Sequence, residues 1–244
     1  MVITSPQTPD KVIQWIDMYT FGEDIVIENE TEDTVLLSLI GPGVRELLDI
    51  DATSLDLFGV ADFYCEGMRL PLIRTDYLGP TSYDLLATSL EADIVWHSLI
   101  RSGAVPIGTE ALEMIRVEHG VPRYSHELGE EFNPLEAGLN SSISYDKGCY
   151  IGQEVVLRLN TYDKVQKHLT GIVIEDGKPD VEAHLEVDGN DAGFLTSVID
   201  SPMLGHSLAL GYLRTKYLSI GQDVEVRISD KLVSAKLIDL PVKS

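Results

Sequence analysis

The last third of the chain consists of short segments in which apolar and polar residues alternate, separated by glycine-containing turns. Six segments of this kind are predicted strands, at 171–175, 184–187, 193–198, 207–213, 223–228 and 232–240. Alternation with a period of two places one side of each strand in a core and the other side towards solvent. Short strands at regular spacing are typical of small all-β barrels and sandwiches. The pattern therefore predicts a separate all-β domain over residues 165–244.

The preceding 164 residues mix the two kinds of periodicity. Helical spacing of apolar residues predicts helices at 12–19, 45–48, 91–102 and 108–120, and runs of β-forming residues predict strands at 24–28, 34–40, 63–66, 68–73 and 83–87. Asp10 is the predicted N-cap of the first helix, and Gly103 is predicted to end the third. The strand at 34–40 is apolar enough to predict burial on both faces. The mixture predicts an α+β domain over residues 1–164.

The charge of the chain restricts its partners. There are 40 acidic and 18 basic residues, a formal net charge of -22. Such a surface repels phosphate backbones and anionic membranes, so nucleic acid is an unfavourable partner and no membrane association is expected. Two cysteines, Cys65 and Cys149, are too few for a disulfide framework or a four-ligand metal site. We therefore expect no metal, and a reducing, cytoplasmic location.

Cys149 is the first candidate for chemistry. Gly148 and Gly152 flank it, and glycines let a backbone turn tightly and approach a ligand closely. The positive charges of Lys147 and Arg158 would lower the pKa of a nearby thiol. Two interpretations stay open at this point, a reactive or ligating thiol on a glycine-rich loop and a buried structural cysteine.

The order of residues in this segment resembles a known family motif. Lys147-Gly-Cys-Tyr-Ile-Gly-Gln-Glu154, followed by Arg158, is similar to the signature Lys-Gly-Cys-Tyr-x-Gly-Gln-Glu-x-x-x-Arg of the YgfZ family. Further segments resemble the wider glycine-cleavage T-protein superfamily, at 74–79, 116–120, 134–139, 193–197, 201–202 and 209–212. The chain therefore resembles a folate-binding protein of this superfamily over nearly its whole length, on the YgfZ side.

The resemblance implies a T-protein-like folate-binding α+β domain, incomplete at its N-terminus, followed by a small C-terminal β-barrel, with tetrahydrofolate as the cofactor. It implies catalytic roles for Cys149 and Lys147. The implied folate-binding residues are Arg116, Glu118, Tyr83, Tyr124, Tyr150, Gln153, Glu154 and Arg158. The alternative for Tyr83 and Tyr124 is core packing, and for Arg116 an exposed position on a helix.

Two departures from the family pattern bear on activity. Pro80 stands where aminomethyltransferases carry a pterin-contacting glutamate, and proline supplies no carboxylate. Residues 2–19 resemble the middle of the family's first half, so the family's N-terminal region, with its catalytic aspartate, has no counterpart here. We expect either a fragment or late-start form, or a partner polypeptide or self-association at that region.

Three hypotheses for function follow. The first is a YgfZ-like tetrahydrofolate-binding protein that supports the assembly or repair of iron–sulfur enzymes, with Cys149 as the functional thiol and iron–sulfur proteins as partners. The second is an aminomethyltransferase of the glycine-cleavage type, which moves a one-carbon unit to tetrahydrofolate. The third is a folate-binding scaffold without catalysis.

Overall fold

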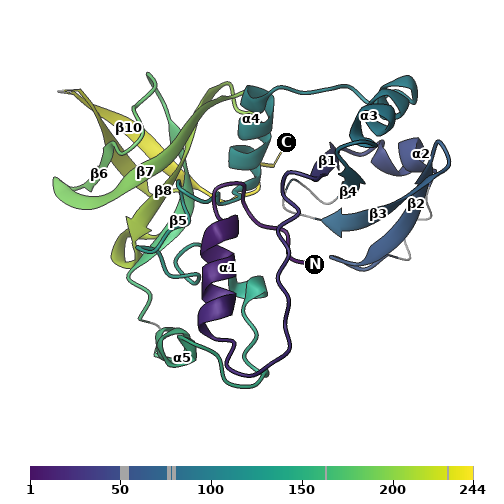
Figure 1. Ribbon diagram of the computed structural model, residues 1–244. Coiled ribbons are helices and arrows are strands. Elements are labelled where there is room, and N and C mark those ends of the chain that lie inside the picture. Colours follow the sequence, from purple (N-terminus) through teal and green to yellow (C-terminus); the bar gives the residue numbers. More distant parts are fainter. Residues whose placement is uncertain (50–54, 76–77, 79–80, 163, 230, 244) are drawn as a thin grey trace. The chain divides into compact units, whose positions relative to one another are not determined.

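The computed structural model describes residues 1–49, 55–75, 78, 81–162, 164–229 and 231–243. The chain forms two compact units, Met1–Pro106 and Ile107–Ser244, whose elements are labelled in Figure 1. The predicted domain boundary between residues 164 and 165 marks the change from the mixed helix and strand pattern to the alternating strands. It lies inside the second unit. The two compact units do not test that boundary, so it stays a prediction.

The first unit is a four-stranded antiparallel sheet with helices. Its elements are α1 (Pro9–Met18), β1 (Thr34–Ile40), α2 (Val44–Leu48), β2 (Val60–Cys65), β3 (Met68–Thr75), β4 (Ser82–Thr88) and α3 (Ala92–Arg101), and the sheet order is β1-β4-β3-β2. A core forms where Leu70 and Leu72 of β3 and Leu85 of β4 pack with Val95 and Leu99 of α3. Glu66 and Gly67 both have positive φ and close the predicted hairpin between β2 and β3.

Three local predictions for this unit were wrong. No strand forms at 24–28, where the described backbone is irregular and largely exposed. β1 is an edge strand with only Leu39 buried, because it pairs with β4 alone and not with two neighbours. Asp10 lies inside α1, since the helix begins at Pro9 and Thr8 is the N-cap residue. A proline at the first helical position is favourable because its missing N–H has no partner there anyway.

The second unit contains α4 (Thr109–His119), α5 (Gln153–Thr161) and a closed antiparallel barrel. The barrel strands are β5 (Lys167–Ile174), β6 (His184–Val187), β7 (Asn190–Ser201), β8 (His206–Arg214), β9 (Asp223–Ile228) and β10 (Lys231–Ile238), in the order β10-β5-β8-β7-β6-β9. All six predicted strands are therefore confirmed, and the barrel with the preceding mixed region confirms the predicted fold class. No helix was predicted at α5, and none of its residues is buried.

Strand β8 is buried on both faces because two cores meet across it. Leu213 belongs to the barrel interior, while Leu208 and Leu210 face outward and pack with Val117 of α4. The pairing of β8 with β7 leaves no room for a side chain at Gly193, where a Cβ would stand 1.9 Å from the carbonyl oxygen of Tyr212. A close approach of two backbones requires glycine in such a position.

Candidate functional site

The guanidinium of Arg116 is buried at the C-terminal end of α4, with 5% of the residue exposed. Nη1 donates to the carbonyl oxygen of Val121 at 2.6 Å and to Oε2 of Glu127 at 3.0 Å. Nε and Nη2 both reach the carboxylate of Glu113, and Nη2 also donates to Oγ of Ser197 at 2.6 Å. An arginine has five N–H donors, and all five have acceptors within the chain.

Glu127 is the partner that the sequence did not reveal. Its side chain has no exposed surface, and Oε1 accepts hydrogen bonds from Thr196 at 2.8 Å and Ser197 at 2.6 Å. Oε2 accepts the backbone N–H of Arg123 at 3.0 Å in addition to the bond from Arg116. A buried carboxylate is stable only when such partners replace water. Glu127 therefore fastens the segment after α4 to strand β7.

Two further groups complete this α4–barrel cluster, which we define as Glu113, Arg116, Glu127, Ser197 and Tyr212. The hydroxyl of Tyr212 donates to the backbone oxygen of Glu127 at 2.8 Å. Burial raises the pKa of the Tyr212 phenol, and the charges of Glu136 and Glu127 raise it further, so this hydroxyl stays a donor. At Glu113, burial raises the pKa, but the hydrogen bond and charge of Arg116 and the charge of Arg123 outweigh burial and lower it overall.

Glu118, two residues further along α4, makes a separate connection to the barrel. It is buried, and its Oε1 accepts a hydrogen bond from Oγ of Ser201 at 2.5 Å and from the backbone N–H of Met203 at 3.2 Å. Arg116 and Glu118, both predicted folate ligands, thus hold α4 against β7. The alternative interpretation of Arg116, an exposed position on a helix, was wrong, because its acceptors lie on α4, on the loop after α4 and on the barrel. Folate contact by either residue stays a prediction.

The segment from Lys147 to Arg158, which we call the Cys149 segment, is arranged differently. Cys149 is free and exposed on a loop, whereas Cys65 is buried in the core of the first unit. The interpretation of Cys149 as a buried structural cysteine was therefore wrong. Lys147 lies with Nζ 4.7 Å from the ring centroid of Tyr150, a cation–π distance.

The same segment continues into α5. Gly152 directly precedes the helix and has φ +85°, a left-handed conformation that glycine adopts more easily than other residues. Gln153 is half-buried, and Glu154 and Arg158 are exposed on α5. The segment therefore presents one thiol and several polar side chains to solvent, and their assigned roles in binding stay predictions.

The three predicted folate-contacting tyrosines differ in their surroundings. Tyr124 is half-buried beside Leu128, to which it forms an isolated bridge. Tyr83 is fully buried in the sheet of the first unit, as the core-packing alternative expects, and Tyr150 is half-buried in the second unit. The hydroxyl oxygens of Tyr83 and Tyr150 are nevertheless buried without any hydrogen-bond partner in the described part of the chain. Unpaired buried hydroxyls are rare and call for an explanation.

Some residues that the sequence singled out lie outside the part of the chain that the structure describes. Pro80, the departure from the transferase pattern, lies outside the described residues, as do Asp76, Tyr77 and Gly79 of the resemblance at 74–79. Among the described residues, no group of three or more His, Cys, Asp or Glu side chains could hold a metal ion. Within those same ranges, no helix is both long and apolar enough to cross a bilayer.

Comparison with known families matches both halves of the chain. Residues 1–147 match the family described as GCVT N-terminal domain, and residues 167–243 match the glycine cleavage T-protein C-terminal barrel domain. The second match begins at the first residue of β5, so it covers the barrel described above. The two matches leave out residues 148–166, which contain Cys149 and α5.

Individual proteins show the same similarity. The chain is 30% identical over 250 residues to an aminomethyltransferase of Herpetosiphon aurantiacus, covering 99% of this chain and 68% of that protein. It is 30% identical over 248 residues to an aminomethyltransferase of Listeria monocytogenes, again covering 99% of this chain and 68% of that protein. It is 33% identical over 231 residues to a putative chloroplastic transferase of Arabidopsis thaliana, covering 93% and 53%.

A solved structure shares the fold. The crystal structure of the glycine cleavage system aminomethyltransferase T from Bartonella henselae superposes with a TM-score of 0.82 at 19% sequence identity, covering 96% of this chain and 66% of that chain. The chain therefore spans about two thirds of the length of the aminomethyltransferases that it matches.

Proposed function

Because the chain belongs to the glycine cleavage T-protein family, we propose that it binds tetrahydrofolate and acts in the transfer of a one-carbon unit, as an aminomethyltransferase does. The observation that carries this proposal is that both domains of the family occur, in order, along one chain, and that relatives matched over 99% of it are named aminomethyltransferase. The proposal favours the second of the three hypotheses above over the YgfZ-like one.

The unpaired hydroxyls of Tyr83 and Tyr150 support folate binding by these residues. A pterin or benzoyl-glutamate group offers nitrogen and oxygen atoms that a buried hydroxyl can bond, and leaving such a hydroxyl unpaired costs about 1–3 kcal/mol. The half-buried ring of Tyr150 would also supply a flat apolar surface for stacking. In this proposal each tyrosine is a folate contact to be tested within its own unit, Tyr83 in the first and Tyr150 in the second.

Replacing each tyrosine by phenylalanine tests that role with two opposite effects. Tyr83→Phe and Tyr150→Phe should each leave the free protein as stable as the wild type or more stable by about 1 kcal/mol, because the unpaired hydroxyl is removed. The same changes should weaken tetrahydrofolate binding about tenfold, measured by calorimetry. The exposed Tyr64 and Tyr162 provide matched controls, and their phenylalanine variants should bind as the wild type does. Absence of any tetrahydrofolate binding to the wild-type chain would contradict the proposal.

Activity is a separate measurement. The chain should form methylenetetrahydrofolate when it is mixed with tetrahydrofolate and an aminomethyl-loaded lipoyl carrier protein. Folate binding without product would leave the third hypothesis, a scaffold that binds folate and does not catalyse.

The exposed thiol favours the YgfZ-like function as a second candidate. Cys149 is free and exposed and follows Lys147 closely, and the segment carries the YgfZ-like spelling. In that function, Cys149 would act as the thiol that supports iron–sulfur enzymes. Cys149→Ala should then abolish complementation of a bacterial strain lacking the YgfZ protein while tetrahydrofolate binding persists. Full complementation by this variant would exclude the role of the thiol.

A further inference from the structure

A small cavity lies on the outer face of the barrel, at one end of strands β5, β8, β7 and β6. Its volume is about 250 Å³, and its walls come from all four of these strands. Register places Lys167 beside Arg214, and Phe194 beside both Tyr212 and His184. Leu213 and Leu195 point into the barrel core, so the alternate residues Tyr212, Arg214 and Phe194 point outward and reach the cavity.

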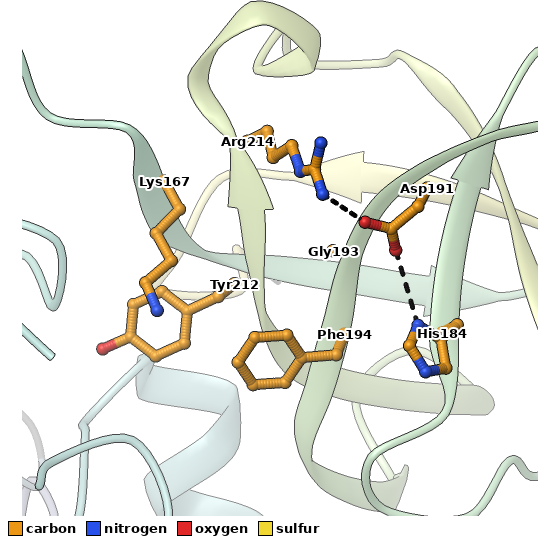
Figure 2. A pocket seen from close by; sticks show the side chains of 7 residues that line it. All are labelled: Lys167, His184, Asp191, Gly193, Phe194, Tyr212 and Arg214. Carbon is orange, nitrogen blue, oxygen red and sulfur yellow. Dashed lines mark hydrogen bonds and ion pairs between the residues drawn. The ribbon is translucent and has the colours of Figure 1, made fainter. Parts of the chain in front are cut away.

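One side of the cavity is a group of aromatic rings with an ammonium among them (Figure 2). The Lys167 Nζ lies 5.0 Å from the ring centroid of Tyr212 and 5.6 Å from that of Phe194. It also lies 4.5 Å from the ring centroid of Phe132, which stacks on Tyr212 at 4.4 Å with an interplanar angle of 9°. Among the described residues, no carboxylate forms an ion pair with Lys167. Lys167 itself is half-buried, in a chain of net charge -22.

The other side of the cavity carries a short chain of charges. Arg214 is ion-paired with Asp191, and the other oxygen of Asp191 lies 3.4 Å from Nδ1 of His184, as the dashed lines in Figure 2 show. Asp191 therefore pairs with Arg214 and not with Lys167. With a neutral histidine, the formal charges of Lys167, Arg214 and Asp191 sum to one positive charge.

We propose that this cavity binds a small organic anion in which a carboxylate is attached to an aromatic ring. The ring would pack against the half-buried Phe194, and the carboxylate would pair with Lys167 and with the outer N–H groups of Arg214. A cavity of this size lies at the low end of small-molecule sites, so it suits a single ring. A cationic ligand is unsuited, because the ammonium of Lys167 already occupies the group of rings.

This site goes beyond the proposed function and uses other residues. None of its lining residues is among the predicted folate ligands. Binding of an aromatic carboxylate can therefore be present whether or not tetrahydrofolate binds, and the two proposals are tested with different ligands.

Calorimetry of the full chain with benzoate, benzamide and inorganic phosphate tests the proposal. Benzoate should bind with one-to-one saturation. Benzamide has the same shape without charge and should bind at least about tenfold more weakly, since one charge-assisted contact is worth about this factor. Inorganic phosphate has the charge without the ring and should also bind more weakly than benzoate. Equal binding of benzoate and benzamide, or no saturation by benzoate, would overturn the proposal.

Substitutions of the residues that line the cavity test whether benzoate binds there. Lys167→Gln and Arg214→Gln should each weaken benzoate binding about tenfold, because each loses one charged contact to the carboxylate. Lys178→Gln is the matched control, since Lys178 is an exposed lysine of the same unit that pairs with Asp200. Unchanged affinity for benzoate in both variants would overturn the proposal that benzoate binds in this cavity. Displacement of benzoate by stoichiometric tetrahydrofolate would overturn its independence from the folate site.

Discussion

Arg116 of the α4–barrel cluster and the Cys149 segment were both singled out by the sequence, yet the two regions differ in burial and in pairing. In the cluster, each N–H of Arg116 has an acceptor, and Glu127 has donors on both oxygens. In the segment, Cys149 is exposed and none of the nine residues of α5 is buried. A conspicuous sequence pattern can therefore mark a structural junction or a free surface, and burial with hydrogen bonding distinguishes them.

The largest expected effect is on stability, at Glu127. Glu127→Ala leaves the guanidinium of Arg116 and the hydroxyls of Thr196 and Ser197 without a carboxylate partner in a buried position. Breaking a buried pair by removing one partner costs about 3–5 kcal/mol. Urea denaturation should show this loss, while Glu131→Ala, an exposed control from the same loop, should change the free energy of unfolding by less than about 0.5 kcal/mol. A loss as small as that of the control would contradict the structural role of the cluster.

A smaller effect is expected at the edge of the cluster. Tyr212→Phe removes the hydrogen bond to the backbone oxygen of Glu127 and keeps the ring that stacks on Phe132. The variant should lose about 1 kcal/mol of unfolding free energy, the usual net value of one hydrogen bond. The exposed Tyr162, changed to phenylalanine, should show no loss. Equal free energies of unfolding for the two variants would contradict a stabilising role of the Tyr212 hydrogen bond.

The dependence of the unfolding free energy on pH should reveal the contribution of the Glu113 carboxylate. Its pKa in the folded protein lies below the ordinary value of 4.5, so its ionised form stabilises the fold above that pH. This contribution is lost as the pH falls below about 4.5 and through the folded pKa. Glu113→Gln should therefore flatten the fall in stability over this acidic range, and Glu110→Gln, an exposed control on the same helix, should not. Parallel acid profiles for the wild type and Glu113→Gln would contradict this assignment.

The smallest effect on stability is expected in the Cys149 segment. Cys149→Ser should change the free energy of unfolding by less than about 0.5 kcal/mol, because the side chain is exposed. Labelling by a thiol reagent should modify Cys149 in the folded protein, while Cys65 should react only after unfolding. Two thiols of equal reactivity in the folded state would contradict the difference between the two regions.

Much of the fold could be predicted from local pattern. The six barrel strands and the hairpin around Gly67 follow from alternation and turn residues, which act over a few positions. Residues 24–28 were apolar enough to suggest a strand but have no partner strand in the described structure, because strand pairing depends on residues distant in sequence. Helix α5 was not predicted, although Val155, Val156, Leu157 and Leu159 give it apolar residues.

The candidate site was less predictable than the fold. The sequence indicated Arg116, Glu118, Tyr83 and Tyr150, but not that Arg116 bonds Glu127 and Ser197 or that Lys167 lies among three rings. Two of the partners of Arg116, Glu127 and Ser197, stand 11 and 81 positions away along the chain. No local motif encodes such a contact.

The sequence by itself determined the six strands of the C-terminal β domain and the resemblance to the T-protein superfamily, because periodicity and motif order are properties of neighbouring residues. Only the tertiary structure decided which of the indicated side chains are free to act. It enclosed Arg116 and Glu118 against the barrel, exposed Cys149, and left the hydroxyls of Tyr83 and Tyr150 unpaired among the described residues. The physical reason is that burial and hydrogen-bond satisfaction are set by which distant segments meet.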